Sequence, residues 1–168
     1  MENEQLFNVK KLFDENLVLV DVECNDSIEL LNYLSDFAYE KGLVHSSFKQ
    51  AVVEREKYFP TGLQMPQLRI AIPHTDSKHV KEPRVIVAKL KKPVLFKAMG
   101  IDEDEVAADI VFMLLINNDG HQVFLLQNIM NLCMNEEISN KLLNLNTSEE
   151  IYKFIQYYYD TYAEYCDD

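Results

Sequence analysis

Apolar residues recur every three or four positions in five segments of the chain, which is the spacing of a helix with one buried face. In the first segment Asp26 and Glu29 form a capping-box pattern, and Gly42 suits a helix terminator. In the last segment Thr147 and Glu150 repeat the capping-box pattern. The five predicted helices run from 26 or 27 to 42, from 46 or 47 to 59, from 121 to 134, from 136 to 145 and from 147 to 162.

Between these segments, runs rich in Val, Ile, Leu and Phe predict strands. The predicted strands cover residues 17–22, 68–72, 84–90, 94–96 and 109–116. The last of them is an unbroken apolar run, which is typical of a strand buried on both faces. Residues 59–66 contain Pro60, Gly62 and Pro66 and are predicted to form a loop.

The order of these elements predicts the fold class. One strand and two helices precede several strands, and three helices follow, so we expect an α/β fold with one mixed sheet flanked by helices on both faces. A length of 168 residues suits one compact domain. We assign residues 1–168 to it, with the core at about residues 15–155 and an acidic, tyrosine-rich helix and tail after it.

The tyrosines of this C-terminal segment allow two interpretations. Six of the nine tyrosines in the chain fall between residues 152 and 165. Part of them can pack on the sheet at helical spacing, or they can form a partner surface, because tyrosine supplies contact area at low entropic cost.

Charge and cysteine content narrow the classes of function. The 28 acidic and 16 basic residues give a net charge of −12, which opposes binding to nucleic acid and to anionic lipid. No apolar run reaches the length of a membrane-spanning helix, and residues 1–4 lack the pattern of a secretion signal. The three cysteines (Cys24, Cys133 and Cys166) are widely spaced. This spacing argues against a disulfide framework and against a zinc ribbon. We therefore expect a cytoplasmic protein with reduced thiols and without direct membrane insertion.

One histidine is placed for chemistry. Pro73 follows the predicted strand 68–72 and cannot continue a central ladder, because it has no N–H. His74 therefore stands on a loop at the mouth of a strand, where reactive side chains are common. A neutral imidazole there can accept a phosphoryl group if an arginine fork stabilises the phosphoryl oxygens. Arg55 is a candidate for that fork, and His121, at the start of a helix, is a candidate second donor.

Two stretches of sequence carry a family resemblance. Residues 55–63 read Arg-Glu-Lys-Tyr-Phe-Pro-Thr-Gly-Leu, and residues 70–76 read Ile-Ala-Ile-Pro-His-Thr-Asp. Together they resemble the enzyme IIA domain of the fructose–mannitol class of the sugar phosphotransferase system. The Pro-His-Thr-Asp ending, and the strand at 111–114 followed by Gly120-His121, look most like the galactitol-type branch. The resemblance covers roughly residues 15 to 155.

The resemblance implies a fold, a set of site residues and partners. It implies the mannitol-type IIA fold, with His74 as the phosphorylated histidine, Arg55 as the arginine that supports the phosphate and His121 as the second active-site histidine. In this family the histidine takes phosphate, on Nε2, from the phosphocarrier protein HPr. It passes the phosphate to a IIB domain, which phosphorylates sugar entering through a membrane channel. The resemblance implies no cofactor and no metal.

Three alternatives stay open from the sequence. Some proteins of this family are regulators of the nitrogen type, which act by phosphorylation-dependent protein binding. A metal-dependent hydrolase built on His74, Asp76, His79 and His121 has suitable ligand types but no known ligand spacing. Arg55 can also be an ordinary helix arginine paired with Glu54 or Glu56.

Overall fold

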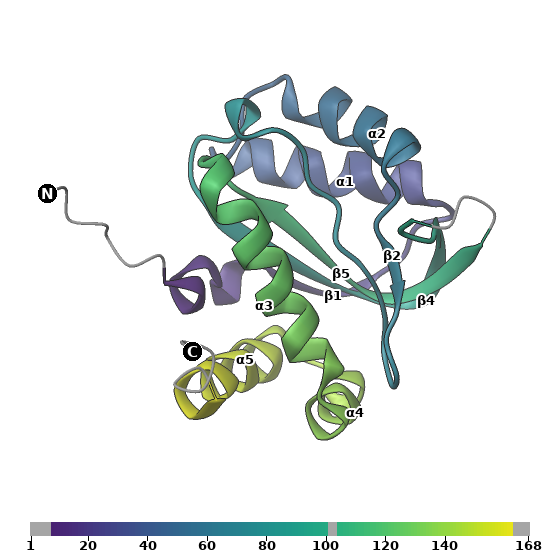
Figure 1. The fold of residues 1–168 in the computed structure, drawn as a ribbon, viewed down its shortest axis with the longest axis vertical. Coiled ribbons are helices and arrows are strands. Elements are labelled where there is room, and N and C mark those ends of the chain that lie inside the picture. The colour runs from purple at the N-terminus through teal and green to yellow at the C-terminus, as the bar shows by residue number, and fades with distance from the viewer. Residues whose placement is uncertain (1–7, 101–103, 163–168) are drawn as a thin grey trace, which may run out of the picture.

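A five-stranded mixed sheet with helices on both faces forms the body of the protein (Figure 1). The computed structural model describes residues 8–100 and 104–162. The N-terminal residues 1–4 and the tail that contains Tyr165 and Cys166 lie outside the described residues. Within the described part of the chain, no helix is long and apolar enough to cross a membrane.

The sheet mixes parallel and antiparallel pairs. Its strand order is β1-β4-β5-β3-β2. β4 pairs antiparallel with β5 at the centre, and β1 and β3 each pair in parallel with the central strand beside them. The strands are β1 (Val18–Val22), β2 (Gly62–Gln64), β3 (Arg69–Ala71), β4 (Arg84–Lys97) and β5 (Glu105–Leu115).

The five predicted helices are confirmed. They are α1 (Ser27–Glu40), α2 (Phe48–Tyr58), α3 (Gln122–Met134), α4 (Glu136–Asn144) and α5 (Ser148–Tyr162). Both predicted caps form: the Asp26 side chain accepts from the Glu29 N–H at 2.8 Å, and the Thr147 hydroxyl accepts from the Glu150 N–H at 3.1 Å. The Glu150 carboxylate also accepts from the Thr147 N–H, whereas that of Glu29 accepts from the N–H of Asn25. Each cap satisfies an N–H that the first helical turn leaves without a partner.

Two sequence predictions about the strands are wrong in detail. Residues 62–64, predicted to be loop, form β2, whose hydrogen bonds come from antiparallel pairing with β3. Pro60 and Pro66 flank this short edge strand and leave its three residues free to pair. The separate strands predicted at 84–90 and 94–96 are one strand, β4, with a register shift between Lys89 and Val94.

The apolar run of β5 supplies two cores. Phe112 and Leu114 belong to the core under α3, α4 and α5, whereas Val111 and Met113 belong to the core under α1 and α2. Side chains alternate between the faces of a strand, so a strand covered on both faces is apolar at every position. The prediction of a buried central strand and of helices on both faces is confirmed.

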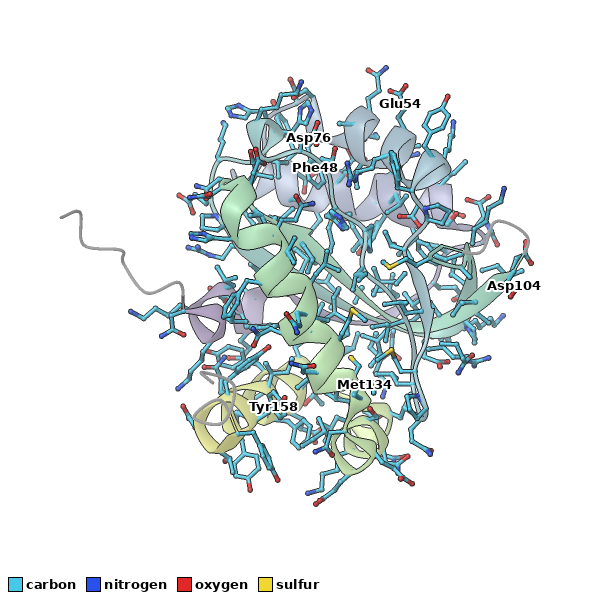
Figure 2. The ribbon with its side chains drawn as sticks, in the orientation of Figure 1. Phe48, Glu54, Asp76, Asp104, Met134 and Tyr158 are labelled. Atoms are coloured by element: carbon cyan, nitrogen blue, oxygen red, sulfur yellow. The ribbon has the colours of Figure 1, made fainter. Side chains whose placement is uncertain are left out.

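The tyrosines of α5 divide between core and surface. Tyr158 and Tyr159 are buried, and the ring of Tyr159 lies 5.7 Å from the ring of Phe13. Figure 2 shows Tyr158 on α5, among the side chains of the core that α3, α4 and α5 cover. Tyr157 is exposed. Part of the tyrosine stripe therefore packs against the core.

Gly62 marks a place where two strands approach too closely for a side chain. A Cβ on Gly62 would lie 2.7 Å from the carbonyl oxygen of Lys97 and 3.2 Å from the Cβ of Val106. The Gly62→Ala variant should lose about 1–3 kcal/mol of unfolding free energy in urea, because backbone must move to admit the methyl group. Gly120→Ala is the matched control, since its Cβ would meet only the side chain of Asn118, at 3.3 Å. Equal stability of the two variants would contradict this packing.

Candidate active site

His74 lies where the ladder between β3 and β5 stops. The Leu114 N–H donates to the carbonyl of Pro73 at 3.0 Å, so the chain stays attached to β5 for two residues beyond the end of β3. The imidazole follows directly and is buried, with 8% of the residue exposed. His74 therefore lies at the end of a strand, as the sequence predicts.

The imidazole is held in one orientation. Its Nδ1 lies 2.7 Å from the carbonyl oxygen of Ile72. Because a carbonyl only accepts, Nδ1 carries the hydrogen and Nε2 keeps its lone pair. Burial lowers the pKa of His74, and the positive charge of Arg55 lowers it further, against the opposing effect of the bond to Ile72. The ring is therefore neutral at pH 7, with Nε2 available as a nucleophile.

Arg55 lies beside His74, although it comes from a different layer of the fold. It lies in the last turn of α2. Its guanidinium stacks over the ring of Phe59 at 5.1 Å, and one terminal nitrogen lies 3.7 Å from a carboxylate oxygen of Asp76. Asp76 is two residues after His74, so this ion pair joins α2 to the loop of the histidine. Among the ion pairs of residues 8–100 and 104–162, none joins Arg55 to Glu54 or Glu56, the pairing that the sequence left open.

One nitrogen of Arg55 is available to donate a hydrogen bond to a ligand. Its Nε is buried and has no hydrogen-bond partner among the described residues. A buried donor without a partner is costly, and an anion that accepts from it recovers that free energy. Asp76 is 66% exposed, so its ion pair with Arg55 is weak and a phosphoryl oxygen can compete with it. The guanidinium is thus placed for an anion next to His74.

The strand topology places His121 at the same edge of the sheet as His74. It is the residue before the first residue of α3 and is partly buried. His121 follows β5 and His74 follows β3, and these neighbouring strands are parallel. Both histidines therefore follow the carboxyl ends of adjacent strands, where ligands of α/β proteins commonly bind.

The His79 imidazole is bound to the start of α2. Its Nδ1 lies 2.7 Å from the hydroxyl of Ser47, at the start of α2, and the His79 carbonyl accepts from the His45 N–H at 2.9 Å. Over residues 8–100 and 104–162, no three His, Cys, Asp or Glu side chains come together as metal ligands. The hypothesis of a metal-dependent hydrolase therefore receives no support from the structure.

Sequence reasoning missed one residue of this region, Glu56. Its carboxylate turns inward and accepts from the N–H of Thr61 at 2.8 Å and from the hydroxyl of Thr61 at 2.9 Å. Burial raises the pKa of Glu56 to about 7, against the opposing effect of these two hydrogen bonds. Nothing in the local sequence distinguishes Glu56 from the exposed Glu54, because the difference lies in the tertiary contact.

The state of the His74 ring is directly measurable. In the unphosphorylated protein, ¹⁵N–¹H correlation spectra should show His74 with a hydrogen on Nδ1, a bare Nε2 and a pKa below the ordinary value of 6.5. The Arg55→Gln variant should raise that pKa, because it removes the nearby positive charge and leaves the burial in place. The ring signal that is missing from the spectrum of the His74→Ala variant is thereby assigned to His74. A hydrogen on Nε2, or a pKa at or above 6.5, would contradict the geometry.

Comparison with known proteins places the chain in a family. Residues 11–158 match the family model described as "Phosphoenolpyruvate-dependent sugar phosphotransferase system, EIIA 2". The chain is 29% identical over 136 residues to the galactitol-specific EIIA component from Escherichia coli (strain K12), covering 81% of this chain and 90% of that relative.

Two solved structures share the fold. A putative phosphotransferase-system IIA (PtxA) from Streptococcus mutans superposes with a TM-score of 0.74 at 19% identity, over 93% of this chain and 97% of that one. The mannitol enzyme IIA from Escherichia coli, solved in complex with phosphorylated mannitol enzyme IIB, superposes with a TM-score of 0.68 at 22% identity, over 86% of this chain and 96% of that one. With a family model that spans 148 of its 168 residues, the chain belongs to the EIIA 2 family of the phosphoenolpyruvate-dependent sugar phosphotransferase system.

Proposed function

We propose that this protein carries phosphate in a sugar phosphotransferase system, accepting it from phosphorylated HPr on Nε2 of His74 and passing it to a IIB domain. One observation supports this most strongly: a neutral imidazole with Nδ1 bound to a carbonyl lies beside an arginine with a buried nitrogen that has no partner. The first group is the acceptor that phosphoryl transfer needs, and the second is a donor for the phosphoryl oxygens.

The transfer step follows from the state of the ring. The lone pair of Nε2 attacks phosphorus, the N–P bond breaks in the donor histidine of HPr, and its nitrogen keeps the electron pair. No proton leaves His74, because its only hydrogen is on Nδ1 and stays bound to the carbonyl of Ile72. That carbonyl stabilises the positive charge that the ring acquires when Nε2 bonds to phosphorus.

Arg55 acts on the phosphoryl group in this scheme. Phosphoryl transfer depends mainly on positioning and on stabilising charge on the phosphoryl oxygens. The guanidinium leaves the exposed carboxylate of Asp76 and binds those oxygens, including through Nε. We assign His121 the role of a second donor, supported by its place before α3, where helix N–H groups also favour an anion.

The surroundings of the site suit a protein as donor and acceptor. Exposed apolar side chains lie at the end of α2 and the start of α3: Phe59 is 63% exposed, Val123 74% and Phe124 44%. Such residues next to a reactive group are typical of a docking surface. The net charge of −12 favours basic partners, and it disfavours nucleic acid.

The sugar and the compartment are part of this proposal. We propose a galactitol-type system, because the relative matched over most of both chains is galactitol-specific. We place the protein in the cytoplasm, where a phosphocarrier that works with HPr acts. A protein of the regulatory, nitrogen type would instead bind a regulator and fail to transfer its phosphate to any IIB.

Replacing His74 tests the acceptor. His74→Ala should take up no phosphate from ³²P-labelled phosphorylated HPr, because the accepting nitrogen is gone. His45→Ala, which removes a histidine outside the site, should be labelled like the wild type. The assignment fails if His74→Ala is labelled, and the transport role fails if labelled wild-type protein passes phosphate to no IIB.

Replacing Arg55 and His121 tests the donors. Arg55→Ala should slow uptake of phosphate by about 10²–10³-fold without abolishing it, as for loss of one oriented donor at an oxyanion. His121→Ala should slow uptake as well and leave His74 as the labelled residue. Rapid-quench measurement of the labelled protein gives the rate constants, and wild-type rates in both variants would exclude these roles.

A further inference from the structure

The carboxylate of Glu56 has a position that helix formation does not explain. Glu56 follows Arg55 on α2 but turns toward the start of β2, where both of its partners among the described residues belong to Thr61. Lys57 and Lys97 line a cavity beside it, yet no ion pair links either of them to Glu56 in the described part of the chain. The carboxylate therefore serves to hold Thr61.

Thr61 in turn holds the backbone next to His74. The carbonyl of Thr61 accepts from the N–H of Ile72 at 3.3 Å. The carbonyl of Ile72 accepts from Nδ1 of His74 at 2.7 Å. Three hydrogen-bonded steps thus connect Glu56 to the imidazole. The two residues that they cross are Thr61, just before β2, and Ile72, just after β3.

This arrangement is unfavourable for Glu56 itself. Burial raises its pKa to about 7, so the folded protein loses stability from this residue as pH rises from about 4.5 to 7. An apolar residue in this place would avoid that loss but would leave the N–H and the hydroxyl of the buried Thr61 without the acceptors that Glu56 supplies.

We propose that Glu56 is a positioning residue, which fixes Thr61 and through it the Ile72 carbonyl that sets the tautomer and direction of the His74 ring. This inference rests on the proposed function of His74. Partners of this kind, which orient a reacting imidazole without touching the substrate, change activity by about 10–100-fold in metal sites. The position of Gly62 supports the same account, since the chain directly after Thr61 packs so closely on Lys97 that a Cβ there would lie 2.7 Å from the Lys97 carbonyl oxygen.

Two pairs of variants test the chain of hydrogen bonds. Glu56→Ala removes both acceptors, and Glu56→Gln keeps the size and one acceptor. Thr61→Val removes the hydroxyl, and Thr61→Ser keeps it. Glu54→Gln removes one negative charge from an exposed position of α2 and is the matched control. Circular dichroism first selects the variants that fold, and Thr61→Val, with Thr61→Ser as its conservative partner, carries the test if Glu56→Ala does not fold.

The readouts separate positioning from general damage. Glu56→Ala and Thr61→Val should lower kcat for phosphate uptake about 10-fold or more with KM for phosphorylated HPr unchanged. In the unphosphorylated proteins, the ¹⁵N signals of His74 should move toward an average of the two tautomers. Glu56→Gln and Thr61→Ser should restore most of the rate, and Glu54→Gln should match the wild type.

The proposal is overturned if Glu56→Ala and Thr61→Val keep the wild-type kcat and the wild-type His74 spectrum, or if they change KM alone. The proposed function has a separate failure. A wild-type protein that accepts no phosphate overturns the phosphocarrier role, while the spectra still decide whether Glu56 orients the ring.

Discussion

The hydrogen bond from Nδ1 of His74 to the carbonyl of Ile72 is the interaction on which the site depends. It leaves Nε2 unprotonated and fixes the direction of its lone pair. The carbonyl that accepts it can do so only because the chain around Ile72 is held on two sides. The N–H of Ile72 donates to the carbonyl of Thr61, just before β2, and the carbonyl of Pro73 accepts from the N–H of Leu114 in β5. A histidine on a free loop would exchange between its tautomers and lose this preference.

Much of this framework could be predicted from the sequence. The five helices followed from apolar spacing and from caps, both of which are local. β5 followed from its unbroken apolar run, because a strand covered on both faces has no polar side. The placement of His74 followed from Pro73, whose missing N–H ends a ladder. These features depend on neighbours in the chain, which the sequence shows directly.

The remaining features depend on residues far apart in the chain. β2 forms because β3 pairs with it, and nothing in its own residues, next to two prolines, indicates a strand. Arg55 meets Asp76 across a gap of 21 positions, and Glu56 turns away from its helix neighbours to Thr61. The stretch that resembles a known family contains both Arg55 and Glu56, but the resemblance implies a role for Arg55 alone. Neighbouring residues on one helix thus differ in role because they face different parts of the tertiary structure.

The central claim concerns one atom, Nε2 of His74, and one measurement addresses that atom. The protein is labelled with ¹⁵N in its histidines, phosphorylated by HPr and studied by ³¹P and ¹⁵N NMR. We expect one phosphorus–nitrogen coupling, to Nε2 of His74, while Nδ1 keeps its hydrogen. Coupling to Nδ1, or to a nitrogen of any other histidine, would contradict the account.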